Sequence, residues 1–76
     1  MVDAFVMIKT EAGQSEDIVT GVRKIDEVAE AHIVAGEFDI MTEVTAEEVY
    51  QVLRTASSSI QDLDGITETR TYIALD

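Results

Sequence analysis

Apolar and polar residues follow two different periods along the chain, and the order of these periods predicts the order of its elements. Residues 4–10 form an apolar run rich in β-branched and aromatic residues, which predicts a buried strand. Residues 28–34 and 38–44 have the same character, and the three residues between them predict an antiparallel hairpin. Residues 66–75 alternate between two faces and predict a fourth strand.

Two stretches with helical spacing separate these strands. Ser15 is predicted to cap the first helix, which has acids in its first turn and bases in its last, as the helix macrodipole favours. The charged residues concerned are Glu16, Asp17, Arg23 and Lys24.

The second helix has a start signal and a weak end. Thr45 is predicted to be its N-cap, with Glu48 three residues later completing a capping box. The serines at 57–59 are predicted to weaken its last turn. The residues predicted to face the core are Val49, Val52, Leu53, Ala56 and Ile60.

This order of elements predicts an α+β fold, the ferredoxin-like βαββαβ sandwich, with residues 1–76 as a single domain. Right-handed crossovers place both helices on one face of a four-stranded antiparallel sheet of order 4-1-3-2. The other face then has no cover although several of its residues are apolar, so we expect a second copy to bury it with two-fold symmetry. A chain this short buries only about 60% of its unfolded surface, which also favours oligomerisation.

Charge and composition exclude several classes of function. Sixteen acids and five scattered bases give a net charge of −11, which disfavours direct binding to nucleic acid. The chain has no cysteine, no apolar stretch long enough for a transmembrane helix and no signal peptide at its N-terminus. We therefore expect a cytoplasmic protein that does not associate with membranes.

The sequence contains few residues that could act in catalysis. His32 is the only histidine, and on a strand it is more often a paired sheet residue than a base. A single histidine without cysteine cannot build a zinc site, and the four isolated glycines form no phosphate-binding loop. The sequence therefore predicts no catalytic residue, no metal and no cofactor.

Two features remain as candidate chemistry. The first is the hairpin join at residues 35–39, A-G-E-F-D, where Gly36 permits a positive φ and a plain turn is one explanation. Asp39 is harder to explain as a turn residue, because an acid that enters an apolar strand usually has a partner. The second is Thr69 and Thr71, two hydroxyls on one face of an edge strand, for which β-propensity is the simpler explanation. Together these groups would match the ammonium and carboxylate of a free amino acid.

The motif G-x-x-D at residues 36–39, followed by a helix and then by G-I-x-x-T-x-T at residues 65–71, resembles the effector-binding (RAM) domain of the Lrp/AsnC, or leucine-responsive/feast-famine, transcriptional regulators. The resemblance covers essentially the whole chain. It implies dimers formed through the open sheet face, larger even-numbered oligomers, and an amino acid or related small effector bound between dimers. Carried over to this sequence, the effector site comprises Ala35, Gly36, Glu37, Phe38, Asp39, Thr69 and Thr71. In the family, a small residue with a hydroxyl group often precedes the glycine, whereas this chain has Ala35 there. This difference affects one expected contact with the ligand and does not affect the expected fold.

Regulators of this family also carry an N-terminal helix-turn-helix, for which these 76 residues have no room. We therefore expect a stand-alone RAM domain that senses an effector or modulates full-length Lrp/AsnC regulators by mixed assembly. Two alternatives remain open. One is a small dimeric α+β-barrel enzyme of the cofactor-free monooxygenase kind, which would need a base in a deep pocket. The other is a purely structural oligomerisation domain.

Overall fold

The computed structural model describes residues 1–76 and contains the six predicted elements in the predicted order. A short π-helix, η1, extends the second helix. The elements are β1 (Val2–Thr10), α1 (Ser15–Val22), β2 (Val28–Ile33), β3 (Ile40–Ala46), α2 (Val49–Arg54), η1 (Thr55–Ile60) and β4 (Ile66–Ile73).

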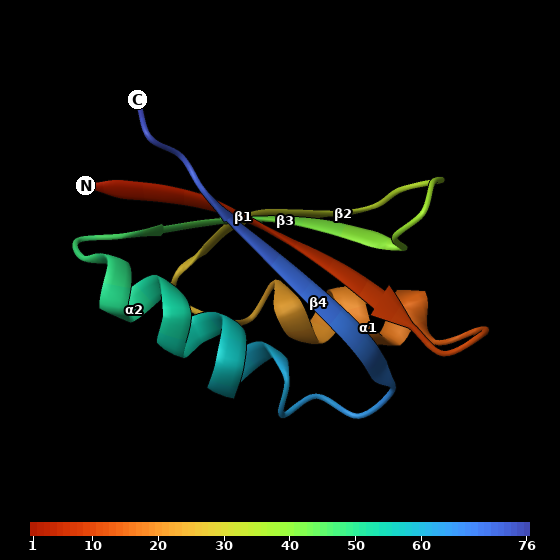
Figure 1. Ribbon diagram of the computed structural model, residues 1–76. Coiled ribbons are helices and arrows are strands. Elements are labelled where there is room, and N and C mark those ends of the chain that lie inside the picture. Colours follow the sequence, from red (N-terminus) through yellow and green to blue (C-terminus); the bar gives the residue numbers. More distant parts are fainter.

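The four strands form one antiparallel sheet of order β2-β3-β1-β4, so the predicted ferredoxin-like α+β fold is confirmed. Both helices lie on the same side of this sheet, and no element covers the other side (Figure 1). We call the uncovered side the open face. None of the helices is long and apolar enough to cross a membrane.

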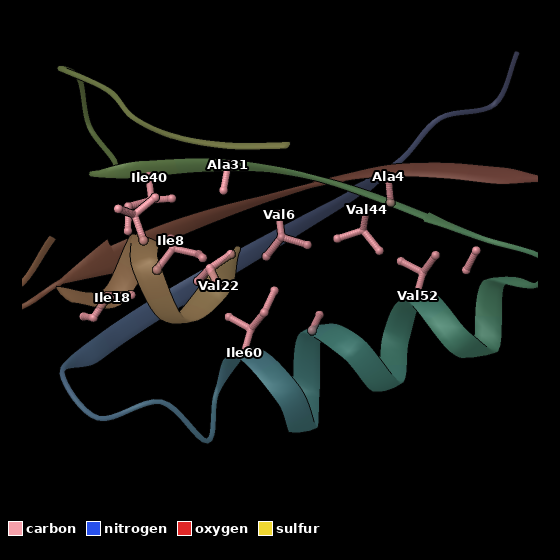
Figure 2. Packing of buried hydrophobic residues seen from close by; sticks show 13 residues of the cluster. Ala4, Val6, Ile8, Ile18, Val22, Ala31, Ile40, Val44, Val52 and Ile60 are labelled. Carbon is pink, nitrogen blue, oxygen red and sulfur yellow. The ribbon is translucent and has the colours of Figure 1, made fainter. Parts of the chain in front are cut away.

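The core lies between the sheet and the helices (Figure 2). Strand β1 contributes Ala4, Val6 and Ile8, none of which has any exposed surface. The other buried apolar residues of this cluster are Ile18, Val19, Val22, Ala31, Ile40, Val44, Ala46, Val52, Ala56 and Ile60.

The apolar face of the second helix is narrower than the sequence predicted. Val52, Ala56 and Ile60 face the sheet in a single stripe, whereas Val49 and Leu53 are 45% and 49% exposed. The prediction that Val49 and Leu53 belong to the core is therefore wrong. Leu53 is turned about 100° from Val52 around the helix axis, and Val49 lies in the first turn, at the margin of the contact.

The predicted N-cap of the second helix is also wrong. Thr45 belongs to β3, where it pairs with Asp3 of β1 and its hydroxyl donates to Asp3 Oδ1 at 3.2 Å. The N-cap is Glu48, and Gln51 Oε1 accepts hydrogen bonds from the backbone N–H of Glu48 and of Glu47, at 3.3 and 3.0 Å. The strand pairing thus holds the chain extended beyond the point where the local sequence favours a helix.

Helix α1 begins and ends slightly earlier than predicted. Its N-cap is Gln14, so Ser15 lies inside the helix instead of capping it, and the Ser15 Oγ lies 3.0 Å from Thr10 Oγ1. Arg23 is the C-cap and Lys24 lies beyond the helix, so its last turn contains no base. The acids of the first turn are placed as predicted.

The serine-rich end of the second helix changes its type of winding. From Thr55 onward the backbone is π-helical, and the Thr55 hydroxyl donates to the carbonyl oxygen of Gln51 at 2.9 Å. Ile60 closes this segment and is fully buried in the core. The last turn, which the serines were predicted to weaken, is wound as a wider π-helix, and Ile60 packs it against the sheet.

Thr42 is the one buried side chain whose hydroxyl has no hydrogen-bond partner. It lies on β3 with 0% exposure, between Val6 of β1 and Ala31 of β2.

Replacing that hydroxyl by a methyl group in Thr42→Val removes an unsatisfied polar group with little change of shape, so we expect the free energy of unfolding to rise by about 1 kcal/mol. Urea denaturation measures it. Thr45→Val is the control, because the Thr45 hydroxyl is bonded to Asp3. A loss of stability in Thr42→Val would contradict this account.

Candidate functional site

The hairpin loop that joins β2 to β3 lies at the end of the sheet opposite the two chain termini (Figure 1). The loop is closed by the Val34 N–H, which donates to the carbonyl oxygen of Asp39 at 2.9 Å. Ala35, Gly36 and Glu37 at its tip are all exposed. Strand β3 begins only after this loop, two residues later than the sequence predicted.

Gly36 is not required by the fold. Positive φ occurs only at Gly13 and Gly65, so the positive φ that glycine would permit at position 36 is not used in this turn. A Cβ built at Gly36 would meet no atom within 4 Å. Neither backbone conformation nor packing within the chain explains this glycine, and the loop backbone around it is left uncovered.

Asp39 has a partner, as expected for an acid that enters an apolar strand, but the partner belongs to the same chain. The Thr10 N–H donates to Asp39 Oδ2 at 2.8 Å, and the Thr10 hydroxyl lies 3.3 Å from the same oxygen. The Asp39 N–H donates to the carbonyl oxygen of Ile8 at 2.9 Å. These contacts fix the hairpin to the end of β1 and, through the contact between the Thr10 and Ser15 hydroxyls, to the start of α1. Asp39 Oδ1 makes no hydrogen bond within the chain.

Phe38 is turned inward from the loop and is only 7% exposed. Two cationic groups lie over its ring: Lys9 Nζ is 5.8 Å and Arg70 Cζ is 5.2 Å from the ring centroid. A side-chain hydrogen bond with Tyr72 is the main influence that raises the pKa of Arg70, and Glu37 contributes a smaller effect in the same direction, so Arg70 stays cationic. Phe38 therefore anchors the loop to β1 and β4 through cation–π attraction.

The two threonines of β4 lie on the helix-covered side of the sheet. Thr69 pairs with Ile8 and Thr71 with Val6, and both of these β1 residues point into the core. Thr69 Oγ1 accepts a hydrogen bond from Gln61 Nε2 at 2.9 Å. Thr69 also borders a surface hollow of about 180 Å³ whose other lining residues are Gln61, Ile66, Thr67 and Glu68.

The hairpin and the threonine pair do not meet in one chain. Ile8 of β1 pairs with Ile40 on one side and with Thr69 on the other, so β1 separates Asp39 from the threonines. The hollow beside Thr69 includes no residue of the hairpin loop. Within one chain, the hairpin loop and the threonine pair therefore line no common hollow.

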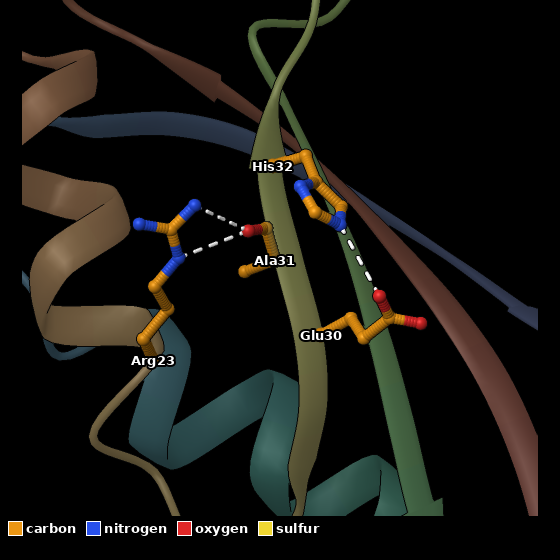
Figure 3. Close-up of polar contacts among 4 residues, drawn as sticks. All are labelled: Arg23, Glu30, Ala31 and His32. Carbon is orange, nitrogen blue, oxygen red and sulfur yellow. Dashed lines mark hydrogen bonds and ion pairs between the residues drawn. The ribbon is translucent and has the colours of Figure 1, made fainter.

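Two further hollows lie away from the hairpin. The larger, about 340 Å³, borders β2, where Arg23 Nε and Nη2 donate to the carbonyl oxygen of Ala31 at 3.0 and 2.8 Å (Figure 3). His32 on the same strand is exposed, and its Nε2 lies 3.4 Å from Glu30 Oε1. His32 pairs with Met41 of β3, so its interpretation as a paired sheet residue is confirmed.

The other hollow, about 220 Å³, is lined only by polar residues of the second helix and by Glu27. No sequence pattern pointed to the roles of Thr10 and Arg23. Thr10 binds Asp39, which is distant in the sequence, and Arg23 binds the backbone carbonyl oxygen of Ala31.

The family model of the "Lrp/AsnC ligand binding domain" matches residues 3–76. The proline dehydrogenase transcriptional activator of Rhizobium radiobacter is 32% identical over 75 residues, which cover 95% of this chain and 48% of that protein. The leucine-responsive regulatory protein of Escherichia coli K12 is 28% identical over 61 residues, covering 80% of this chain and 37% of that protein. The chain thus spans about half or less of these relatives. Both are regulators of transcription and not enzymes, which confirms the prediction of a non-enzymatic domain.

The fold has close counterparts among solved structures. The crystal structure of TTHA0845 from Thermus thermophilus superposes with a TM-score of 0.96 at 25% identity, covering 100% of this chain and 95% of that one. This agreement includes the hairpin, since the whole chain is covered.

Two glycine variants test whether Gly36, unlike Gly65, is dispensable for the stability of the fold. Gly36→Ala should leave the free energy of unfolding unchanged or raise it by about 0.4–1 kcal/mol, because alanine restricts the unfolded chain and meets nothing in the folded one. Gly65→Ala should lower it by about 1–2 kcal/mol, because Gly65 has a φ of +94° and its Cβ would lie 3.1 Å from Ile18 Cδ1. Thermal denaturation of both variants tests this. Equal destabilisation by the two would show that the loop glycine is structural.

Proposed function

Because the chain belongs to the Lrp/AsnC ligand-binding domain family, we propose that it senses a small effector, a free amino acid or a related molecule, and couples this to oligomerisation in transcriptional regulation. The name of the leucine-responsive relative from Escherichia coli supports an amino acid as the class of effector. The sequence-based alternative of a dimeric α+β-barrel enzyme has no support, because the relatives regulate transcription and the only histidine is exposed on β2.

The observation that carries this proposal is the uncovered hairpin tip beside the anchored Asp39. Gly36 leaves the loop backbone uncovered without being needed for the fold, so its N–H groups are free to bind an effector carboxylate. Asp39 is held by Thr10 through Oδ2 while Oδ1 stays free, and this oxygen is suited to an ammonium group. The loop therefore offers complementary groups for both ends of a free amino acid.

Thr69 and Thr71 complete the proposed site from a neighbouring dimer. Thr69 Oγ1 accepts a hydrogen bond from Gln61, so its own proton remains available to donate to a carboxylate. Because β1 separates these threonines from Asp39 in one chain, the proposal takes the two sets of groups from different copies. Effector binding and assembly are then thermodynamically linked, so the effector shifts oligomer size and dilution weakens effector binding. Mixed assembly with full-length regulators of the family would transmit this response.

Effector binding is tested by thermal shift with each of the twenty amino acids. A ligand at 100 times its Kd should stabilise the domain by about 2.7 kcal/mol. Asp39→Asn keeps an oxygen for Thr10 but removes the charge, so we expect a normal fold and an effector affinity about 10- to 100-fold lower. Asp39→Ala is less informative than Asp39→Asn, because it also leaves the Thr10 N–H without its acceptor.

The matched control is Asp17→Asn, which makes the same change of charge at an exposed position of α1 and should leave affinity unchanged. If no amino acid or related molecule shifts the melting temperature, the sensing proposal fails and a purely structural oligomerisation domain is the better account. If an effector binds equally well to Asp39→Asn, the pocket lies elsewhere.

The 76-residue chain should show no measurable affinity for duplex DNA near physiological salt. Its net charge of −11 repels phosphates, and two of its five bases, Lys9 and Arg70, are committed to Phe38. A gel-shift titration measures this. Micromolar binding by the chain alone would contradict the prediction, whereas an effect that requires a full-length partner would not.

A further inference from the structure

The second helix carries two stripes of residues with different chemistry. Val52, Ala56 and Ile60 form the apolar stripe that packs against the sheet. A second stripe follows the spacing i, i+3, i+4, i+7 and i+8 along α2 and η1, which usually marks an apolar contact face. Here every member is polar, and together with Glu27 the stripe lines a hollow of about 220 Å³: Gln51, Arg54, Thr55, Ser58 and Ser59. No apolar residue lines this hollow.

Glu27 lies in the connection between α1 and β2, where its backbone is fixed and its carboxylate is not. The Thr45 N–H donates to the carbonyl oxygen of Glu27 at 2.9 Å. The Thr55 hydroxyl lies 3.3 Å from Glu27 Oε1 but only 2.9 Å from the carbonyl oxygen of Gln51, and its single proton serves the nearer acceptor. The half-buried carboxylate is therefore left without a committed donor at a fixed position beside the hollow.

Arg54 provides a positive charge at the same hollow. Its guanidinium makes no ion pair within the chain, and Glu27 makes none either. Because the chain has sixteen acids and only five bases, a guanidinium that shares a hollow with a carboxylate would be expected to pair with it. The two groups instead stay further apart than an ion pair allows, with the hydroxyls of Ser58 and Ser59 beside them.

The winding of η1 holds these hydroxyls in place. Thr55 at its start is 3% exposed and Ile60 at its end is fully buried, so the serines between them lie on a segment that is anchored at both ends. π-Helical turns are rare and occur frequently at functional sites. The polar groups of the hollow are thus positioned before a ligand arrives, which lowers the entropic cost of binding.

We propose that this hollow is a second small-molecule site, which binds a small polar zwitterion of the amino-acid class. Arg54 binds the ligand carboxylate and Glu27 binds the ligand ammonium group. A simple anion would be repelled by Glu27 and a simple cation by Arg54, so only a ligand with both charges satisfies both residues. Ser58 and Ser59 supply hydrogen bonds to a polar side chain. This inference goes beyond the proposed function, since it uses no group of the hairpin.

The size of the hollow restricts the ligand further. A water molecule's share of liquid volume is about 30 Å³, so a hollow of about 220 Å³ has room for roughly seven non-hydrogen atoms. Serine has this size, and its hydroxyl matches the polar lining. A bulky apolar amino acid would exceed the volume and would find no apolar contact.

Amide correlation spectra of the chain, recorded during a titration with serine, test the site. A titration to about 10 mM covers dissociation constants in the millimolar range. The signals of residues 51–59 and of Glu27 should shift together and reach saturation. Residues 35–39 report on the hairpin in the same spectra. If the signals of residues 51–59 do not shift in a saturable way, the proposal is overturned.

Two charge variants identify the groups that bind. Glu27→Gln and Arg54→Gln each remove one charge and leave a polar side chain, so each should weaken serine binding about 10- to 100-fold. The matched controls, Glu16→Gln and Lys24→Gln, make the same changes of charge at exposed positions outside the hollow and should change the affinity less than about threefold. Equal effects of all four variants would show a response to net charge alone and would overturn the site.

A pair of serine variants tests the hollow without changing any charge. Ser58→Leu fills the hollow and should abolish serine binding. Ser57→Leu adds the same side chain one residue away, at an exposed position that does not line the hollow, and should leave binding unchanged. Leucine is the better helix former, so both variants should fold, which circular dichroism checks. Unimpaired binding to Ser58→Leu would contradict the proposal.

Analogues of serine test whether both charges are recognised. Ethanolamine lacks the carboxylate, β-hydroxypropionate lacks the ammonium group, and glycerol lacks both. Each should bind at least about tenfold more weakly than serine, because it leaves at least one charged residue of the hollow without its partner. Equal binding of glycerol would show a site for neutral polyols and would overturn the assignment to zwitterions.

The hollow and the hairpin site can fail separately. Every group of the hollow belongs to one chain and none to the hairpin, so Asp39→Asn should leave the serine-induced shifts at residues 51–59 unchanged. Loss of these shifts in Asp39→Asn would overturn the inference. If the shifts persist while no amino acid changes the oligomer size, the hollow stands and the sensing proposal fails. Effector-linked assembly without shifts at residues 51–59 would give the reverse result.

Discussion

Two short helices can cover only one face of a four-stranded sheet, and the rest of the structure depends on this constraint. The covered side receives every residue of the apolar cluster, including the three fully buried residues of β1. The open face keeps Phe5, Met41 and Tyr72 exposed. No element of these 76 residues forms another layer, so this apolar surface is available to a second molecule. The uncovered face therefore follows from the number of elements and not from poor packing.

The hairpin loop is held by contacts that are independent of this core. Asp39 accepts the N–H of Thr10 at the end of β1, and Phe38 is clamped beneath Lys9 and Arg70. The glycine at the tip, Gly36, has no such contacts. A rigid base with an uncovered tip is the arrangement that a binding loop requires, because the backbone groups are positioned before a ligand arrives.

Much of the fold was predictable because it depends on local periodicity. The alternation of the strands and the spacing of Val52, Ala56 and Ile60 determined the element order, and the chirality of crossovers then implied the sheet order. The errors arose where a distant partner decides the local structure. Thr45 has the chemistry of an N-cap, but its pairing with Asp3 keeps it in the strand.

The same limit applies to the candidate site. The sequence showed that Asp39 needs a partner, and it could not show that the partner is Thr10, 29 residues earlier. The positive φ that the sequence permits at Gly36 occurs at Gly13 and Gly65 instead, and the hairpin turns without it. At the free edge of the sheet, Arg23 occupies the outward carbonyl of Ala31 with two hydrogen bonds, an interaction that no local pattern announced. By occupying that acceptor, the guanidinium disfavours the addition of a further strand at β2. The apolar open face is thus combined with a sheet edge that resists cross-β growth.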